Sequence, residues 1–212
     1  MECKGHYPAD FKAALKRTPL KNGEIETLCS KFNSRPIFIY DHLMIPTILK
    51  YFAGDPDPET SSAAQEIDMT PARLPEHKLH HFAEVGEPGL PVMVPSRFRS
   101  DEVQGMLVFG LTNHQCRNIL QFECSKSNQL ELVLVRTQVS FNGKVNGYDA
   151  PCWRSIEART LIWMDGVENM SGLLPMETTY WPIDDFIAGK LYKGIVDDVK
   201  REERLRDNLA QI

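Results

Sequence analysis

Hydrophobic residues occur along the chain in two spacings, and the change from one to the other separates predicted strands from predicted helices. Residues 36–40 and 106–111 are almost continuously apolar, as expected for strands that are buried on both faces. Residues 130–141 and 155–164 are rich in β-branched and aromatic residues, which favours two further strands. The candidates for the inward face of the second are Ile156, Ala158, Leu161 and Trp163.

Apolar residues at helical spacing predict helices over residues 11–17, 24–32 and 43–52, and another helix directly after residue 111. A last helix is expected after Pro182, although two glycines inside it weaken the pattern. Its predicted buried stripe consists of Ile183, Phe186, Ile187, Leu191, Ile195 and Val199.

Prolines, glycines and short polar residues mark the connections between these elements. Two short strands are expected on either side of Pro75, over Ala72–Leu74 and Lys78–Ala83. The Pro/Gly-rich segment 86–95 is expected to be irregular and to run over a pocket. The other predicted loops and turns are residues 55–64, Asn142–Gly143 and Asn146–Gly147.

The order of these elements predicts an α+β fold, with a mixed or antiparallel curled sheet or a small β-barrel and flanking helices. The strands after residue 130 follow one another with no helix between them, which favours antiparallel pairing. We expect residues 1–34 to form an N-terminal arm, residues 35–200 a single domain, and residues 201–212 a charged helical tail.

Composition narrows the classes of function. The net charge of −5 disfavours nucleic acid or an anionic membrane as the main partner. No apolar run is long enough to span a membrane, and the first residues lack the hydrophobic segment of a signal peptide, so a cytoplasmic location is expected. The 5 cysteines are odd in number and show no CxxC spacing, which predicts reduced thiols and neither disulfides nor a zinc framework.

The stretch that ends at Glu123 is the best candidate for chemistry. Thr112 and Gln115 fit a capping box at the start of a helix. One face of that helix then carries Cys116, Ile119, Leu120 and Glu123. A carboxylate therefore ends an otherwise apolar stripe. If it is buried, its pKa rises and it can act as a general base or acid near neutral pH; alternatively, it turns into water at the helix end.

Other chemistries have weaker support. The chain contains no sequence motif of a serine hydrolase, a zinc protease, a phosphate-binding loop or a dinucleotide-binding fold. Cys124 has no histidine placed by the sequence to activate it as a nucleophile. A metal site is a further alternative at His77, His80 and His81. We expect core or pocket-wall positions, not nucleic-acid stacking, for Trp153, Trp163 and Trp181.

Two segments carry a family resemblance. The first, Ile37-Phe-Ile-Tyr40-Asp-His-Leu43-Met44, is similar to a strand that ends in Tyr-Gly-x-Leu. The second begins with Val103-Gln-Gly105-Met-Leu107 and ends with Phe122-Glu123, similar to a strand and short helix that lead to a Phe-Glu pair. In this order they resemble the γ-glutamylcyclotransferase-like family, also called AIG2-like, in which that glutamate is catalytic. The resemblance extends over about residues 36–190.

The chain departs from the family pattern at two places. Asp41 stands where the family has a glycine, in a loop whose backbone N–H groups face the γ-glutamyl part of the substrate in relatives. Aspartate lacks the backbone freedom of glycine and adds a negative charge there. After Glu123, residues 124–128 replace the glycine and tyrosine that relatives often carry. The catalytic carboxylate is kept while its surroundings change.

The resemblance implies a cofactor-independent cyclotransferase or lyase of glutathione or secondary metabolism. Glu123 would take a proton from the substrate α-amino group, which attacks the γ-carbonyl to form 5-oxoproline, and would then protonate the departing amine. Ring closure within one molecule needs no metal and no organic cofactor. The substrate-binding loop would be Tyr40, Asp41, His42 and Leu43, with Tyr40 either lining the pocket through its hydroxyl or serving as a core aromatic residue. The expected partner is a small molecule, with no nucleic acid and no membrane.

Two alternatives stay open. One is a repurposed acid/base cyclase or isomerase that acts on a larger or non-glutamyl specialised metabolite, such as a glutathione adduct. The other is a non-catalytic binding module, which predicts that Glu123 is exposed or paired with a cation such as Arg136 or Arg159. Either enzyme predicts Glu123 at the floor of a cavity, with a raised pKa.

Overall fold

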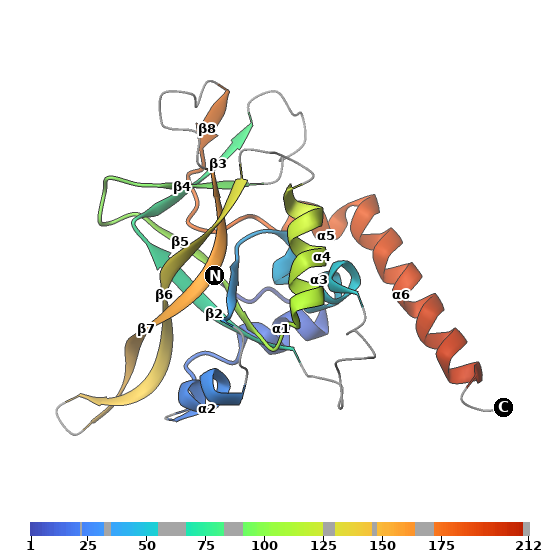
Figure 1. The fold of residues 1–212 in the computed structure, drawn as a ribbon, viewed down its shortest axis with the longest axis horizontal. Helices are drawn as coiled ribbons and strands as arrows, with labels where there is room; N and C mark the ends of the chain where they lie inside the picture. Colours follow the sequence, from blue (N-terminus) through green and yellow to red (C-terminus); the bar gives the residue numbers. More distant parts are fainter. Residues whose placement is uncertain are drawn as a thin grey trace.

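The structure, a computed structural model, describes residues 1–21, 23–31, 35–54, 67–82, 91–124, 130–145, 148–163 and 172–209. Five strands close into a barrel in the order β1–β5–β2–β6–β7, and three others form a small sheet in the order β4–β3–β8. Figure 1 shows α3, α4 and α5 together on one side of the barrel. The predicted α+β fold with a small mixed β-barrel and flanking helices is confirmed.

The barrel strands are β1 (Ile37–Ile39), β2 (Asp68–Pro75), β5 (Glu102–Phe109), β6 (Leu130–Val145) and β7 (Tyr148–Trp163). The small sheet contains β3 (His77–Phe82), β4 (Val92–Pro95) and β8 (Leu173–Pro175). The α-helices are α1 (Ala9–Leu15), α2 (Glu24–Lys31), α3 (Pro46–Ala53), α4 (Asn113–Cys124), α5 (Asp184–Ala188) and α6 (Lys190–Leu209), and the short 3₁₀ helix η1 covers His42–Met44. The predicted helices in the first 53 residues are therefore confirmed.

The short strand β1 closes the barrel. It pairs antiparallel with β5, where Phe38 lies opposite Leu107, and parallel with β7, where Ile37 lies opposite Arg159. Gly105 on β5 permits this close approach, because a Cβ at that position would lie 2.2 Å from the Ile39 carbonyl oxygen. The chain leaving β1 is thereby directed into the space beside α4.

The N-terminal segment contributes to the main core. Phe11 is 0% exposed and Leu20 is 1% exposed, and both belong to the same hydrophobic cluster as the barrel residues. The Leu20 N–H donates to the Ser140 carbonyl at 3.0 Å, and the Asn142 N–H donates to the Leu20 carbonyl at 2.8 Å. Arg17 forms ion pairs with Glu24 and Asp68. The segment is thus bonded to β6 and to the start of β2.

One of the two predicted Asn-Gly turns is wrong. Asn142 and Gly143 lie inside β6, paired with Pro151 and Ala150, and the antiparallel ladder continues to the Val145–Tyr148 pair. Residues 146–147, the second predicted turn, lie outside the described residues. Asn-Gly is a strong local turn signal, but the pairing of two long strands decides which copy lies between them.

The predicted inward face of β7 is also partly wrong. The buried residues alternate as Ile156, Ala158, Thr160 and Ile162, which places Leu161 on the opposite side of the strand. Trp163 is buried, but in a separate small cluster with Val92, Val94 and Leu173. Adjacent strand residues point to opposite faces, so Leu161 and Trp163 cannot share the face of Ala158.

The segment predicted to be irregular contains a strand. Residues 92–95 form β4, which pairs with β3 from His77↔Pro95 to His80↔Val92. Residues 83–90 and 55–66 lie outside the described residues, and with them the first half of the predicted segment 86–95 and all of the predicted loop 55–64. The two short strands predicted around Pro75 are confirmed, the first in longer form as β2 and the second as β3. They are joined at Glu76, which has a positive φ of 60°.

The C-terminal helix is interrupted, contrary to the prediction. Gly189 has extended backbone angles and separates α5 from α6. This break changes the direction of the helical face, so Leu191 is 60% exposed although Ile195 is 4% exposed. Figure 1 shows α6 extending away from the barrel to the C-terminus.

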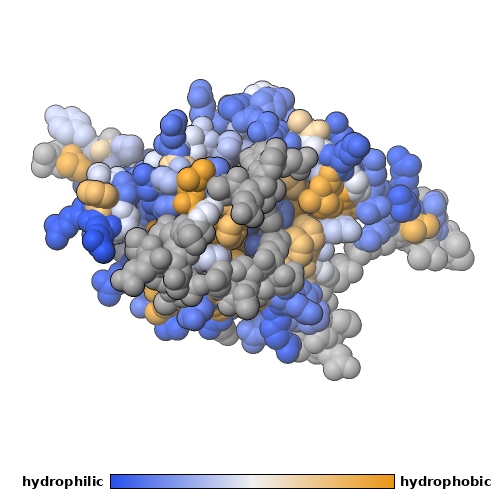
Figure 2. Space-filling model, turned by 90° about the horizontal axis from the view of Figure 1, so that it is seen from above, coloured by the Kyte–Doolittle hydropathy of each residue, from blue (hydrophilic) through white to orange (hydrophobic). Residues whose placement is uncertain are grey.

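On the face seen in Figure 2, hydrophilic side chains predominate and hydrophobic ones form separate small groups. Throughout the described ranges, every helix is too short or too polar to cross a lipid bilayer.

Gly105→Ala should destabilise the protein by at least about 2 kcal/mol, because the new methyl group overlaps the Ile39 carbonyl and the Phe38 ring. The matched control is Gly194→Ala on α6, where an added Cβ has nothing within 4 Å. Alanine favours the helix there, so the control should stabilise by about 0.5–1 kcal/mol. Urea denaturation measures both, and equal stability of the two variants would contradict the close packing of β1.

Candidate active site

Helix α4 is fixed at its N-terminus by the predicted capping box. The Thr112 N–H donates to Gln115 Oε1 at 3.1 Å, and the Gln115 N–H donates to Thr112 Oγ1 at 3.2 Å. The Asn118 side chain donates to the Ala53 carbonyl at 2.8 Å and so ties α4 to the end of α3. The buried face of α4 therefore has a fixed position against α3, and Glu123 lies at the end of that face.

Asp41 caps η1 directly after β1. Its Oδ1 accepts the Leu43 N–H at 2.9 Å, and its carbonyl accepts the Met44 N–H at 3.0 Å. The φ of Asp41 is −121°, an extended conformation that any residue adopts. Asp41 therefore needs no glycine-like backbone here. Its carboxylate adds a negative charge to the loop and accepts a hydrogen bond from the Leu43 N–H.

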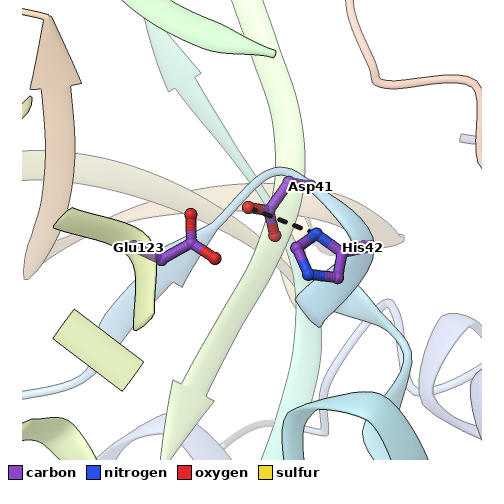
Figure 3. A group of neighbouring side chains, drawn as sticks. All are labelled: Asp41, His42 and Glu123. Carbon is purple, nitrogen blue, oxygen red and sulfur yellow. Dashed lines mark ion pairs between the residues drawn. The ribbon is translucent and has the colours of Figure 1, made fainter. Parts of the chain in front are cut away.

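Three buried polar side chains meet beside this loop. Asp41 and Glu123 are each 7% exposed and His42 is 1% exposed. One potential ligand atom from each lies within 4.8 Å of the others, and Asp41 Oδ2 is 3.7 Å from His42 Nδ1. In Figure 3 the Glu123 carboxylate comes from α4 and faces the pair that follows β1. Tertiary packing thus brings two carboxylates and an imidazole into one apolar region.

Aromatic rings enclose His42. Its ring centroid lies 5.2 to 6.3 Å from those of Phe52, Phe122, Trp181 and Phe186. These rings come from α3, α4, α5 and the segment before α5. Because four separate parts of the chain contribute to this enclosure, it exists only in the folded protein, and it restricts the orientation of the imidazole.

A small cavity lies next to the three polar side chains. Its walls include Tyr40, Asp41, Leu43 and Glu123, together with apolar residues of β1 and α4. Its volume is about 30 Å³, which is room for about two water molecules. The cavity can therefore take one small polar group of a substrate, while the rest of the molecule would have to lie outside it.

Tyr40 both lines this cavity and belongs to the core. Its hydroxyl donates to the Leu161 carbonyl at 3.0 Å. Burial, and then the charges of Asp41 and Glu123, hold the pKa of Tyr40 well above its ordinary value, with the Met93 backbone acting in the opposite direction. The Tyr40 hydroxyl is therefore a neutral hydrogen-bond donor.

Four of the five predicted site residues line the cavity: Tyr40, Asp41, Leu43 and Glu123. His42 lies behind them, among the aromatic rings. The exposed Glu123 that a binding module would carry is contradicted by its burial. Sequence reasoning missed the meeting of His42 with Glu123; the signal available was a polar Asp-His pair directly after a buried strand.

The other sequence candidates form no comparable site. Within the described ranges, Asp41, His42 and Glu123 are the one group of three or more His, Cys, Asp or Glu side chains close enough to share a metal ion. The alternative metal site at His77, His80 and His81 is therefore wrong, since neighbouring residues of β3 point to opposite faces. Cys3, Cys29, Cys116 and Cys152 are free thiols, and the side chain of Cys124 lies outside the description.

Trp153 is 50% exposed and is therefore no core residue, but it lines a surface pocket together with Arg73 and Gln104, as the pocket-wall alternative expected. The Arg73 guanidinium lies 3.7 Å from the centre of its ring. Trp163 and Trp181 are buried, as expected.

Comparison with known proteins gives similarity in structure only. No family model and no curated protein matches the chain. A protein of Arabidopsis thaliana solved in solution is 17% identical, with a TM-score of 0.44 over 84% of this chain and 97% of that one. A structure named γ-glutamyl cyclotransferase is 15% identical, with a TM-score of 0.44 over 79% and 98%. An AIG2-like protein of Mus musculus is 14% identical, with a TM-score of 0.35 over 70% and 88%.

Tyr40→Phe should cost about 1 kcal/mol of stability, because it removes the hydrogen bond to the Leu161 carbonyl and keeps the ring. The control is Tyr51→Phe, whose side chain is 39% exposed and should change stability by less than about 0.5 kcal/mol. Thermal and urea unfolding compare the two variants. Equal stabilities would show that the hydrogen bond from the Tyr40 hydroxyl to the Leu161 carbonyl does not stabilise the folded protein.

Proposed function

We propose that the protein is a γ-glutamylcyclotransferase-like enzyme that cyclises a γ-glutamyl amine compound and releases 5-oxoproline and an amine. The observation that supports this most directly is the burial of Glu123 on the wall of a small cavity, next to a second carboxylate. A carboxylate kept from water in this way is suited to general base and acid catalysis. The resemblance of the segments around Tyr40 and Glu123 supplies the reaction class.

The proposed reaction needs one proton acceptor that later becomes a donor. Glu123 removes a proton from the substrate α-amino group as its nitrogen bonds to the γ-carbonyl carbon. The bond between that carbon and the amide nitrogen then breaks, and Glu123 returns the proton to the departing nitrogen. Because the nucleophile and the carbonyl belong to one molecule, the enzyme mainly has to orient them.

The dimensions of the site support a particular placement of the substrate. The cavity of about 30 Å³ has room for little more than the substrate amino group beside Glu123, so the rest of the substrate, with the leaving amine, would extend out of its mouth. Tyr40 would remain a neutral part of the cavity wall, and its hydroxyl would keep its hydrogen bond to the Leu161 carbonyl. The small cavity therefore favours selection of the leaving group at the rim.

A second candidate function is supported by Asp41. Its carboxylate accepts the Leu43 N–H, a donor that would otherwise face the substrate. An anionic substrate group at this place would meet the negative charge of Asp41. This favours a repurposed acid/base cyclase or isomerase that acts on a specialised metabolite without that anionic group, with Glu123 in the same chemical role.

Glu123→Gln should lower 5-oxoproline release by about 10²- to 10⁴-fold, because the amide is nearly the same size but cannot accept the proton. The measurement is 5-oxoproline release from a panel of γ-glutamyl amides, including glutathione and bulky glutathione S-conjugates. Glu131→Gln, at an exposed position of β6, is the matched control and should keep wild-type activity. The absence of release from every amide with the wild-type protein would refute the cyclotransferase proposal, while full activity of Glu123→Gln would refute the assigned residue.

Asp41→Gly separates the two candidate functions. If γ-glutamyl recognition is only weakened by Asp41, removing the carboxylate should raise kcat/KM for γ-glutamyl amides about tenfold, equivalent to about 1.4 kcal/mol. Asp41→Asn is the control, since it keeps an oxygen that can accept the Leu43 N–H and removes only the charge. No gain in either variant would favour the non-glutamyl substrate.

A further inference from the structure

We propose that Asp41, His42 and Glu123 bind a divalent transition-metal ion of the Zn²⁺ class. This inference goes beyond the proposed function, whose mechanism needs no metal. It is based on the ligand types of these three side chains, their separation, their surroundings and the cavity beside them.

The three side chains offer a suitable set of ligand atoms. Two carboxylate oxygens and one imidazole nitrogen are donors that Zn²⁺ and similar ions accept. Ligand atoms at about 2.1 Å from one ion in tetrahedral geometry lie about 3.4 Å from one another. Asp41 Oδ2 and His42 Nδ1 are 3.7 Å apart, and all three atoms lie within 4.8 Å. The ligands would therefore reach binding distance by moving about 1 Å.

The surroundings hold two of these ligands in a defined orientation. The second oxygen of Asp41 accepts the Leu43 N–H, which leaves Oδ2 directed toward His42. The aromatic rings around His42, including Phe122 and Phe186, restrict rotation of the imidazole. Such contacts behind the ligands are the usual way in which a protein fixes the direction of a metal ligand.

Burial supplies a reason for a cation at this place. Asp41, His42 and Glu123 are all more than nine-tenths buried, and two of them carry carboxyl groups that repel each other when both are ionised. A divalent ion offsets both negative charges at once. The polar group is thus better suited to a metal than an exposed acidic cluster, where water screens the charges.

The cavity provides an open coordination position. Asp41 and Glu123 lie on its wall, and its volume of about 30 Å³ accommodates about two water molecules. Three protein ligands with one position left for water is the arrangement of catalytic zinc sites. A metal bound here would make Glu123 a weaker proton acceptor for the cofactor-independent cyclisation. The metal-bound protein should accordingly cyclise substrate through Glu123 more slowly than the metal-free protein.

The test is direct metal binding by the full chain. After removal of metals with a chelator, the protein is titrated with Zn²⁺ in a calorimeter and with Co²⁺ by visible absorption. We expect one ion per chain. We also expect the visible absorption bands of Co²⁺ in tetrahedral coordination by three protein ligands and one water molecule. His42→Phe, which keeps an aromatic ring inside the enclosure, and Glu123→Gln should each weaken binding at least about a hundredfold.

His114→Ala is the matched control, because His114 is an exposed histidine on α4 and should leave binding unchanged. Circular dichroism and urea unfolding of the metal-free variants check that each one folds. No binding by the wild-type protein, or equal binding by wild type, His42→Phe and Glu123→Gln, would overturn the proposal. Binding is measured without substrate, so its outcome is independent of whether 5-oxoproline release is found.

Discussion

The close packing of β1 between β5 and β7 is the constraint on which the candidate site depends. All of β1 pairs with β5, Ile37 also pairs with Arg159 of β7, and Gly105 leaves space for the Ile39 carbonyl. This packing closes the barrel and fixes the point at which the chain turns into η1. Since Asp41 and His42 follow within three residues of the strand, their position against α4 is a consequence of barrel closure.

Helix α4 meets this loop from the other side. Its capping box and the Asn118 bond to the Ala53 carbonyl hold it against α3, and α3 itself begins directly after η1. The loop and the helix that carry the polar side chains are therefore fixed by one set of contacts. A site built on such elements is held more precisely than one that depends on long loops.

The same geometry supports two uses of Glu123. As a buried carboxylate on the wall of a small cavity it is suited to proton transfer, and as one of three neighbouring donors it is suited to metal binding. These uses compete, because a metal ion bound to the carboxylate lowers its ability to accept a proton. Asp41 influences both, since it adds a charge beside the cavity and directs one oxygen toward His42.

The sequence by itself determined the features that depend on local spacing: the main strands, the capping box of α4, the apolar face that ends at Glu123, and the α+β class. It did not determine which Asn-Gly pair lies between β6 and β7, which side of β7 Leu161 occupies, or the helix break at Gly189. Each of these depends on long-range pairing or packing that outweighs a local preference. The meeting of His42 with Glu123 was likewise decided only by the tertiary structure. The two residues belong to distant segments, and only barrel closure and the packing of α4 remove water from both together.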